Sequence, residues 1–76
     1  MRPIQCRMAR AALGWTTKDL AAKAAVGVNT VNRFEAGQDA RMSSVEKMRA
    51  TLAAAGVIFI EENGEGPGVR LRKARA

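Results

Sequence analysis

The sequence predicts a mainly α-helical domain of four to five helices that ends in a β-hairpin. Two short amphipathic segments joined by a tight turn lie between residues 16 and 37, and helical stripes precede and follow them. An apolar run and a Gly-rich turn lie near the carboxyl end. Because 76 residues leave room for one core, we expect a helical unit over residues 1–56 and a hairpin with a basic tail over residues 57–76.

The first helix is predicted over residues 3–13. Pro3 suits a first helical turn, and Gly14 suits the position after the last turn. Cys6 is expected to be a small buried apolar side chain, with a redox-sensing thiol as the alternative. The core is predicted to form where this helix closes over the middle of the chain, through Cys6, Ala9, Leu13, Trp15, Val26, Val31 and Phe34.

The next two helices are predicted on either side of a turn near Gly27. Thr16 followed by Asp19 has the spacing of a capping box, which starts a helix over residues 17–24. Gly27 can serve as the N-cap of a second helix over residues 28–35. Gly37 is a preferred helix stop.

A last helix and a hairpin complete the prediction. Ser43 and Glu46 have the spacing of a second capping box, and the helix should run to about Ala55. Strands are predicted at residues 57–60 and 69–72, with Val69 and Leu71 sharing the buried face. Since a lone hairpin is marginal in water, it needs either its own helices or, as we favour, a second copy that extends the sheet.

The helix over residues 28–35 has two chemically different faces. At about 100° per residue, Val31 and Phe34 fall on one side. The opposite side can offer bidentate hydrogen bonds to guanine and adenine and an apolar contact to thymine. An ordinary solvated polar face is the alternative. The candidate base-reading residues on this side are Val28, Asn29, Asn32 and Arg33.

The spacing L-A-x-x-A-x-V-x-x-x-T-V-x-R-x-E-x-G over residues 20–37 resembles the Cro/C1-type (XRE) helix-turn-helix family of bacterial and phage transcriptional regulators. The resemblance extends over roughly residues 5–55. Two positions depart from the common pattern, since Ala25 stands where many members have Gly and Gly27 where many have Ser or Thr. Both residues are compatible with the turn, because Ala is small and Gly is an acceptable N-cap.

The resemblance implies a lambda-repressor-like DNA-binding domain. In that family the helix at 28–35 would lie in the major groove, while the helix at 17–24 would place its N-terminus at a phosphate. The phosphate candidates are then Thr16, Thr17 and Lys18, and Arg41 beside the recognition helix is a further one. The resemblance also implies a structural ion pair between Arg10 and Glu35.

Composition narrows the function classes. A net charge of +6 and a pI near 10.8 suit a nucleic-acid partner. With no His and a single Cys, the chain lacks a zinc site and His-based catalysis, so we expect neither an enzyme nor a cofactor, metal or small-molecule ligand. The absence of a long apolar stretch favours a cytoplasmic protein that is nucleoid-associated when bound to DNA.

The expected function is that of a sequence-specific, double-stranded DNA-binding repressor. Two copies would bind an inverted-repeat operator as a homodimer, with half-sites about 34–36 Å apart. The alternative is a protein-interaction module on the same scaffold, such as an antitoxin or an anti-activator. That module would bind its protein partner through the apolar strand at residues 57–60.

Overall fold

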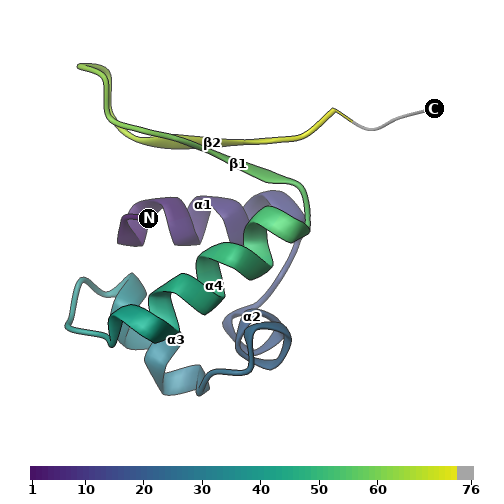
Figure 1. The fold of residues 1–76 in the computed structure, drawn as a ribbon, viewed down its shortest axis with the longest axis vertical. Coiled ribbons are helices and arrows are strands. Elements are labelled where there is room, and N and C mark those ends of the chain that lie inside the picture. Colours follow the sequence, from purple (N-terminus) through teal and green to yellow (C-terminus); the bar gives the residue numbers. More distant parts are fainter. Residues whose placement is uncertain (74–76) are drawn as a thin grey trace.

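The computed structural model describes residues 1–73; the end of the predicted basic tail lies outside them. A small, mainly helical domain with a terminal hairpin is confirmed (Figure 1). The elements in chain order are α1 (Pro3–Leu13), α2 (Thr17–Ala24), α3 (Val28–Glu35), α4 (Met42–Ala54), β1 (Val57–Ile60) and β2 (Gly68–Leu71).

The first three helices begin and end where the sequence predicts. Gly14 ends α1 in the left-handed region at φ 70°. Thr16 and Asp19 form the capping box of α2, and Gly27 is the N-cap of α3. The turn between α2 and α3 is strained at Ala25, which has a φ of 57°. A residue with a Cβ rarely adopts this conformation.

The start of α4 differs from the prediction. The N-cap is Arg41, without a side-chain capping bond, and Ser43 already lies in the first turn. Backbone bonds decide this start, because the N–H groups of Ser44 and Val45 both donate to the Arg41 carbonyl. The predicted capping box of Ser43 and Glu46 is therefore wrong, although the helix ends as expected near Ala55.

The core lies between the helices and the hairpin. Cys6, Ala9 and Val31 are fully buried, as predicted, and Phe34 is 9% exposed. Three further predicted core residues are only half-buried and pack at its margin: Leu13, Trp15 and Val26. The other buried apolar residues come from α2, α4 and β1, and they are Leu20, Ala21, Ala24, Met48, Leu52 and Val57.

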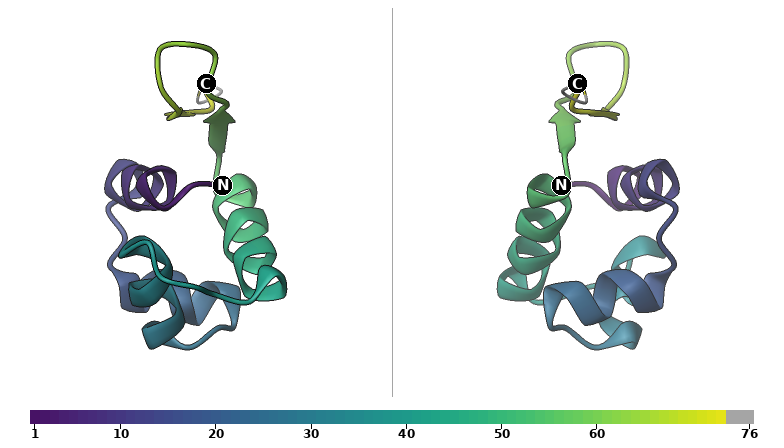
Figure 2. Two further views of the ribbon diagram at one scale, coloured as in Figure 1. Left: turned by 90° about the vertical axis from the view of Figure 1, so that its left-hand side faces the viewer. Right: turned by 90° about the vertical axis from the view of Figure 1, so that its right-hand side faces the viewer.

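The hairpin lies across α1 and α4, at the opposite end of the molecule from the α2–α3 pair (Figures 1 and 2). It is a two-stranded antiparallel sheet in which Val57 pairs with Leu71 and Phe59 with Val69. Val57, Phe59 and Val69 pack on the helical core. The chain's own helices thus cover the inner face of the hairpin. This was the alternative to the favoured expectation of a second copy that extends the sheet.

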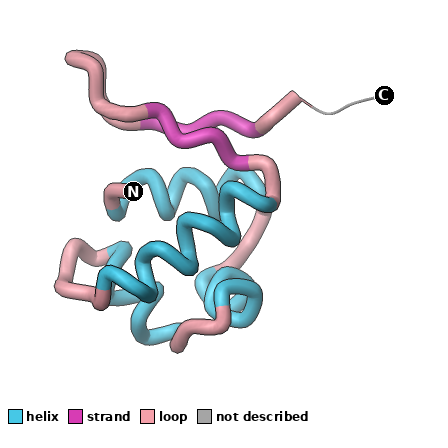
Figure 3. The backbone as a smooth tube through the Cα atoms, in the orientation of Figure 1, coloured by secondary structure: helices cyan, strands magenta, loops and turns pink. Residues whose placement is uncertain are grey.

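The prediction that Leu71 shares this burial is wrong. Its side chain is 46% exposed. Leu71 occupies the last position of β2, and in the described part of the chain the sheet consists of β1 and β2 alone (Figure 3). An apolar side chain therefore remains accessible at this edge.

Candidate nucleic-acid interface

The two faces of α3 have opposite environments. Val31 is fully buried and Phe34 is 9% exposed on the inner face. Asn29, Asn32 and Arg33 are all exposed on the outer face, as the sequence predicts. The fourth candidate, Val28, is half-buried and packs on the core. The outer face therefore presents three polar side chains that could reach base edges.

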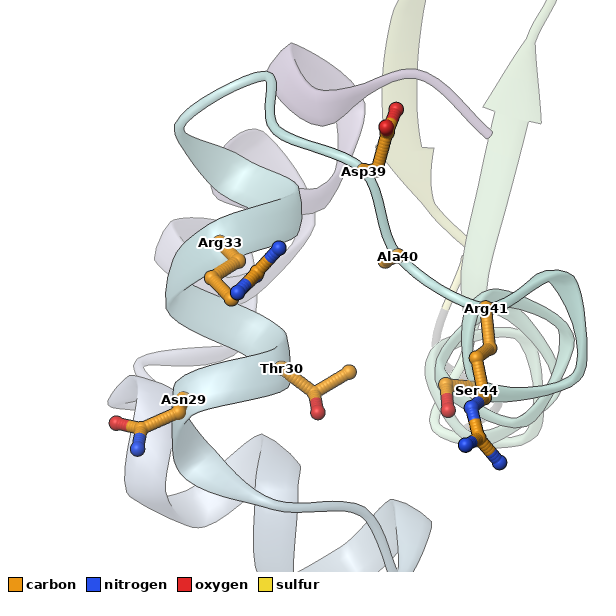
Figure 4. A pocket seen from close by; sticks show the side chains of 7 residues that line it. All are labelled: Asn29, Thr30, Arg33, Asp39, Ala40, Arg41 and Ser44. Atoms are coloured by element: carbon orange, nitrogen blue, oxygen red, sulfur yellow. The ribbon is translucent and has the colours of Figure 1, made fainter.

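A groove opens beside this outer face, between α3 and the start of α4 (Figure 4). Its volume is about 380 Å³. Thr30 points from α3 toward α4, whereas the carboxylate of Asp39 is directed away from Thr30 and Arg41. The lining residues are Asn29, Thr30, Arg33, Asp39, Ala40, Arg41 and Ser44.

Two arginine side chains from separate elements line the groove. Arg33 comes from α3 and Arg41 is the N-cap of α4. Hydroxyl groups from Thr30 and Ser44 lie on the same walls. Guanidinium and hydroxyl groups are the donors that proteins use on phosphate oxygens. Arg41 thus lies beside α3, in a groove that residues of the outer face also line.

Thr30 and Ser44 are contributions to the groove that sequence reasoning missed. On a helical projection Thr30 falls between the inner and outer faces of α3, so its direction depends on how α4 packs. With Ser43 as the expected N-cap, Ser44 would have been the first residue of the helix. In the structure it lies in the first turn of α4 and lines the groove.

The start of α2 carries the other phosphate candidates. Thr16 accepts the Asp19 N–H at 3.0 Å and donates its own N–H to the Asp19 carboxylate at 2.9 Å. Hydrogen bonding to the carboxylate, first from the Thr16 backbone N–H and then from the Thr16 side chain, lowers the pKa of Asp19. Lys18 is exposed and Thr17 half-buried. The three candidates lie together at one helix start, where Thr16 serves as the cap and Asp19 adds a negative charge.

The pairing of Arg10 with Glu35 is present and largely buried. The Arg10 Nε and Nη2 groups donate to the two Glu35 oxygens at 2.6 and 2.7 Å. A third Arg10 bond, from Nη1 to the Trp15 carbonyl, spans 3.1 Å. The bond to Glu35 raises the pKa of Arg10. This pair ties α1 to α3 and to the loop before α2.

Cys6 belongs to the same buried network. Its thiol donates to Glu35 Oε2 at 3.2 Å. Burial, and then the Glu35 carboxylate, raise the pKa of Cys6 to about 12. A thiol that stays protonated near neutral pH is a poor nucleophile. Its environment therefore fits a small buried side chain better than a redox sensor.

Gln5 is a second buried polar residue, and sequence reasoning did not identify it. It is 1% exposed, and its Nε2 group donates to the carbonyls of Ile60 and Gly68 at 3.0 and 3.1 Å. Its Oε1 accepts the Arg2 N–H at 2.8 Å. Gln5 thereby fastens the hairpin to the first turn of α1.

Compared with models of known protein families and with curated protein sequences, the chain has no match. Within residues 1–73, no group of three or more His, Cys, Asp or Glu side chains is placed to hold a metal ion. None of the helices in this part of the chain has the length and apolar character needed to cross a membrane.

Proposed function

We propose that the protein is a sequence-specific DNA-binding repressor whose helix α3 enters the major groove. The observation that carries this proposal is the outer face of α3, where Asn29, Asn32 and Arg33 are exposed beside a groove lined by Arg33 and Arg41. Asn suits adenine, Arg suits guanine, and a second Arg can hold the adjacent phosphate. Val28 contributes at most an apolar contact, because it is half-buried.

Two further features support this function. The net charge of +6 favours association with a polyanion. The short α2 helix packs against α3, and its start carries Thr16, Thr17 and Lys18, which could contact the DNA backbone. Since one α3 helix reads only a few base pairs, we propose that two copies bind an inverted repeat as a homodimer.

The decisive experiment selects bound sequences from a random duplex pool. The expected result is enrichment of a short inverted repeat, whose half-site spacing also gives the symmetry of the bound dimer. Fluorescence anisotropy on the selected duplex should then show an affinity that falls steeply with salt, by about 0.9 log units per log unit of salt for each phosphate bound. If no sequence is enriched and binding is equal on all duplexes, the proposed base-reading role of α3 is wrong.

A further inference from the structure

The free edge of β2 exposes backbone groups that the hairpin does not use. The Arg72 N–H donates to the Gly56 carbonyl, so this pair is a hydrogen-bonded one. Hydrogen-bonded and non-bonded pairs alternate along an antiparallel ladder. In the register of this hairpin, the N–H and C=O groups of Val69 and Leu71 therefore point away from β1. An extended chain could bond to these groups.

Helix α1 places one exposed apolar side chain, Ile4, on the β2 side of the molecule. Gln5 reaches up to the hairpin carbonyls, whereas Cys6 points toward Glu35 of α3. Ile4 precedes Gln5, so it lies about 100° around the helix from Gln5, in the direction opposite to Cys6. Ile4 is therefore on the outer flank of α1, on the side away from α3. Ile4 is 41% exposed, and Leu71 at the end of β2 is 46% exposed.

Cations border this apolar edge. Arg70 and Arg72 alternate with Leu71, so they project from the outer face of the hairpin. Both are exposed, as is Lys73. On α1, Arg7 is exposed three residues after Ile4, which makes the two side chains neighbours on the helix surface. The β2 edge thus combines outward-facing backbone groups and two exposed apolar side chains with a basic rim.

The edge of β1 is a poorer match for a charged partner strand. Its residues Val57, Ile58, Phe59 and Ile60 carry no charge. On the α4 side of this strand, Arg49 lies over the Phe59 ring at 5.1 Å from its centroid. The alternation of charged and apolar side chains is found only on β2.

We propose that the free edge of β2 binds an extended segment of a partner protein in which acidic and apolar residues alternate. The segment would add a third strand, with its acidic side chains beside Arg70 and Arg72 and its apolar ones over Ile4. A second copy fits less well, since pairing two β2 strands would gather the arginines of both copies. This inference does not depend on DNA binding, because the edge lies at the far end of the molecule from α3 (Figure 1).

The test uses a short fluorescein-labelled peptide that alternates Glu and Val, with a Lys and Val peptide as its counterpart. We expect saturable binding of the acidic peptide alone, with NMR shifts concentrated at the amides of Val69 and Leu71. Ile4→Asn and the double change of Arg70 and Arg72 to Glu should each weaken binding about tenfold. The matched control is Ile58→Asn, since Ile58 is 39% exposed on the outer face of β1.

A backbone-modified peptide tests strand addition without altering the protein. In an extended peptide, every second N–H group faces β2. N-methylation of the residues whose N–H groups face β2 should abolish binding, whereas N-methylation of the intervening residues should preserve it. Three results would overturn the proposal: equal binding of the Lys and Val peptide, equal weakening by Ile58→Asn and Ile4→Asn, or concentration-dependent shifts at Val69 and Leu71 without peptide, which indicate a second copy. Displacement of the peptide by random duplex DNA would assign the rim to nucleic acid and overturn it as well.

Discussion

Both faces of α3 carry polar side chains, but those on the inner face are buried and paired, whereas those on the outer face are exposed. On the inner face, Glu35 is 8% exposed and both of its oxygens are bonded by Arg10. On the outer face, Asn29 and Arg33 are exposed at the border of an open groove. A buried polar group is costly unless it is paired, whereas an exposed one is satisfied by water. Stability therefore depends on the inner face, and the outer face is free to be used for binding.

The largest expected effect separates these faces directly. Glu35→Ala leaves the Arg10 guanidinium without its carboxylate partner and should cost about 3–5 kcal/mol of unfolding free energy, a large share of the ~5–15 kcal/mol of a typical domain. DNA binding should then be abolished through unfolding. Urea denaturation followed by circular dichroism measures this destabilisation.

The matched variant is Asn29→Ala, on the outer face. It should change stability by less than about 0.5 kcal/mol while weakening binding to the selected duplex. Equal destabilisation by the two substitutions would contradict the division of α3 into a structural face and a binding face.

The next substitution tests whether a buried polar side chain outside α3 also contributes to stability. Gln5→Ala lies in α1, yet it removes a donor from two carbonyls and an acceptor from the Arg2 N–H. Leaving such groups unpaired should cost about 1–3 kcal/mol. Hydrogen exchange should quicken first at the hairpin amides. Gln38→Ala is the control, since Gln38 is exposed in a loop; equal effects from both would show that the bonds of Gln5 contribute nothing to stability.

Local sequence signals predicted most of the helices and missed what long-range packing decides. Thr16, Asp19 and Gly14 act within one turn, so their patterns are visible in the sequence. The partners of Gln5 lie 55 and 63 positions away, and no local pattern identifies them. The start of α4 was predicted wrongly because Ser43 and Glu46 have the spacing of a capping box. The actual N-cap is Arg41, a residue type that is unusual at this position.

The candidate site divides in the same way. Helical periodicity alone separates Asn29, Asn32 and Arg33 from Val31 and Phe34, and the structure places them on opposite faces. The groove, in contrast, forms between α3 and α4, so its walls at Thr30 and Ser44 depend on how two helices pack. A periodic pattern predicts which residues share a face, but it does not predict what lies opposite that face.

A smaller, stabilising change concerns the turn that orients α3. Ala25→Gly relieves the left-handed backbone at φ 57°, and we expect a gain of about 1 kcal/mol. Ala22→Gly, at an exposed position inside α2, should instead destabilise the domain by about 1 kcal/mol. Thermal unfolding monitored by circular dichroism compares the two. The affinity for the selected duplex should stay the same with Ala25→Gly, since the outer face of α3 is untouched; a lower melting temperature would show that the turn is not strained.

The smallest expected effect tests whether the groove beside the outer face holds a phosphate. Arg41 lines that groove and is exposed at the start of α4, so Arg41→Ala should weaken binding on all duplexes alike. The slope of log affinity against log salt should become shallower by about 0.9 for the one phosphate that Arg41 no longer neutralises. Arg49→Ala, near Phe59, is the matched control and should leave the slope unchanged. Titrations at several salt concentrations measure both slopes. If Arg41→Ala altered the preferred sequence and left the slope intact, Arg41 would be a base-reading residue, and the binding face would extend from α3 onto α4.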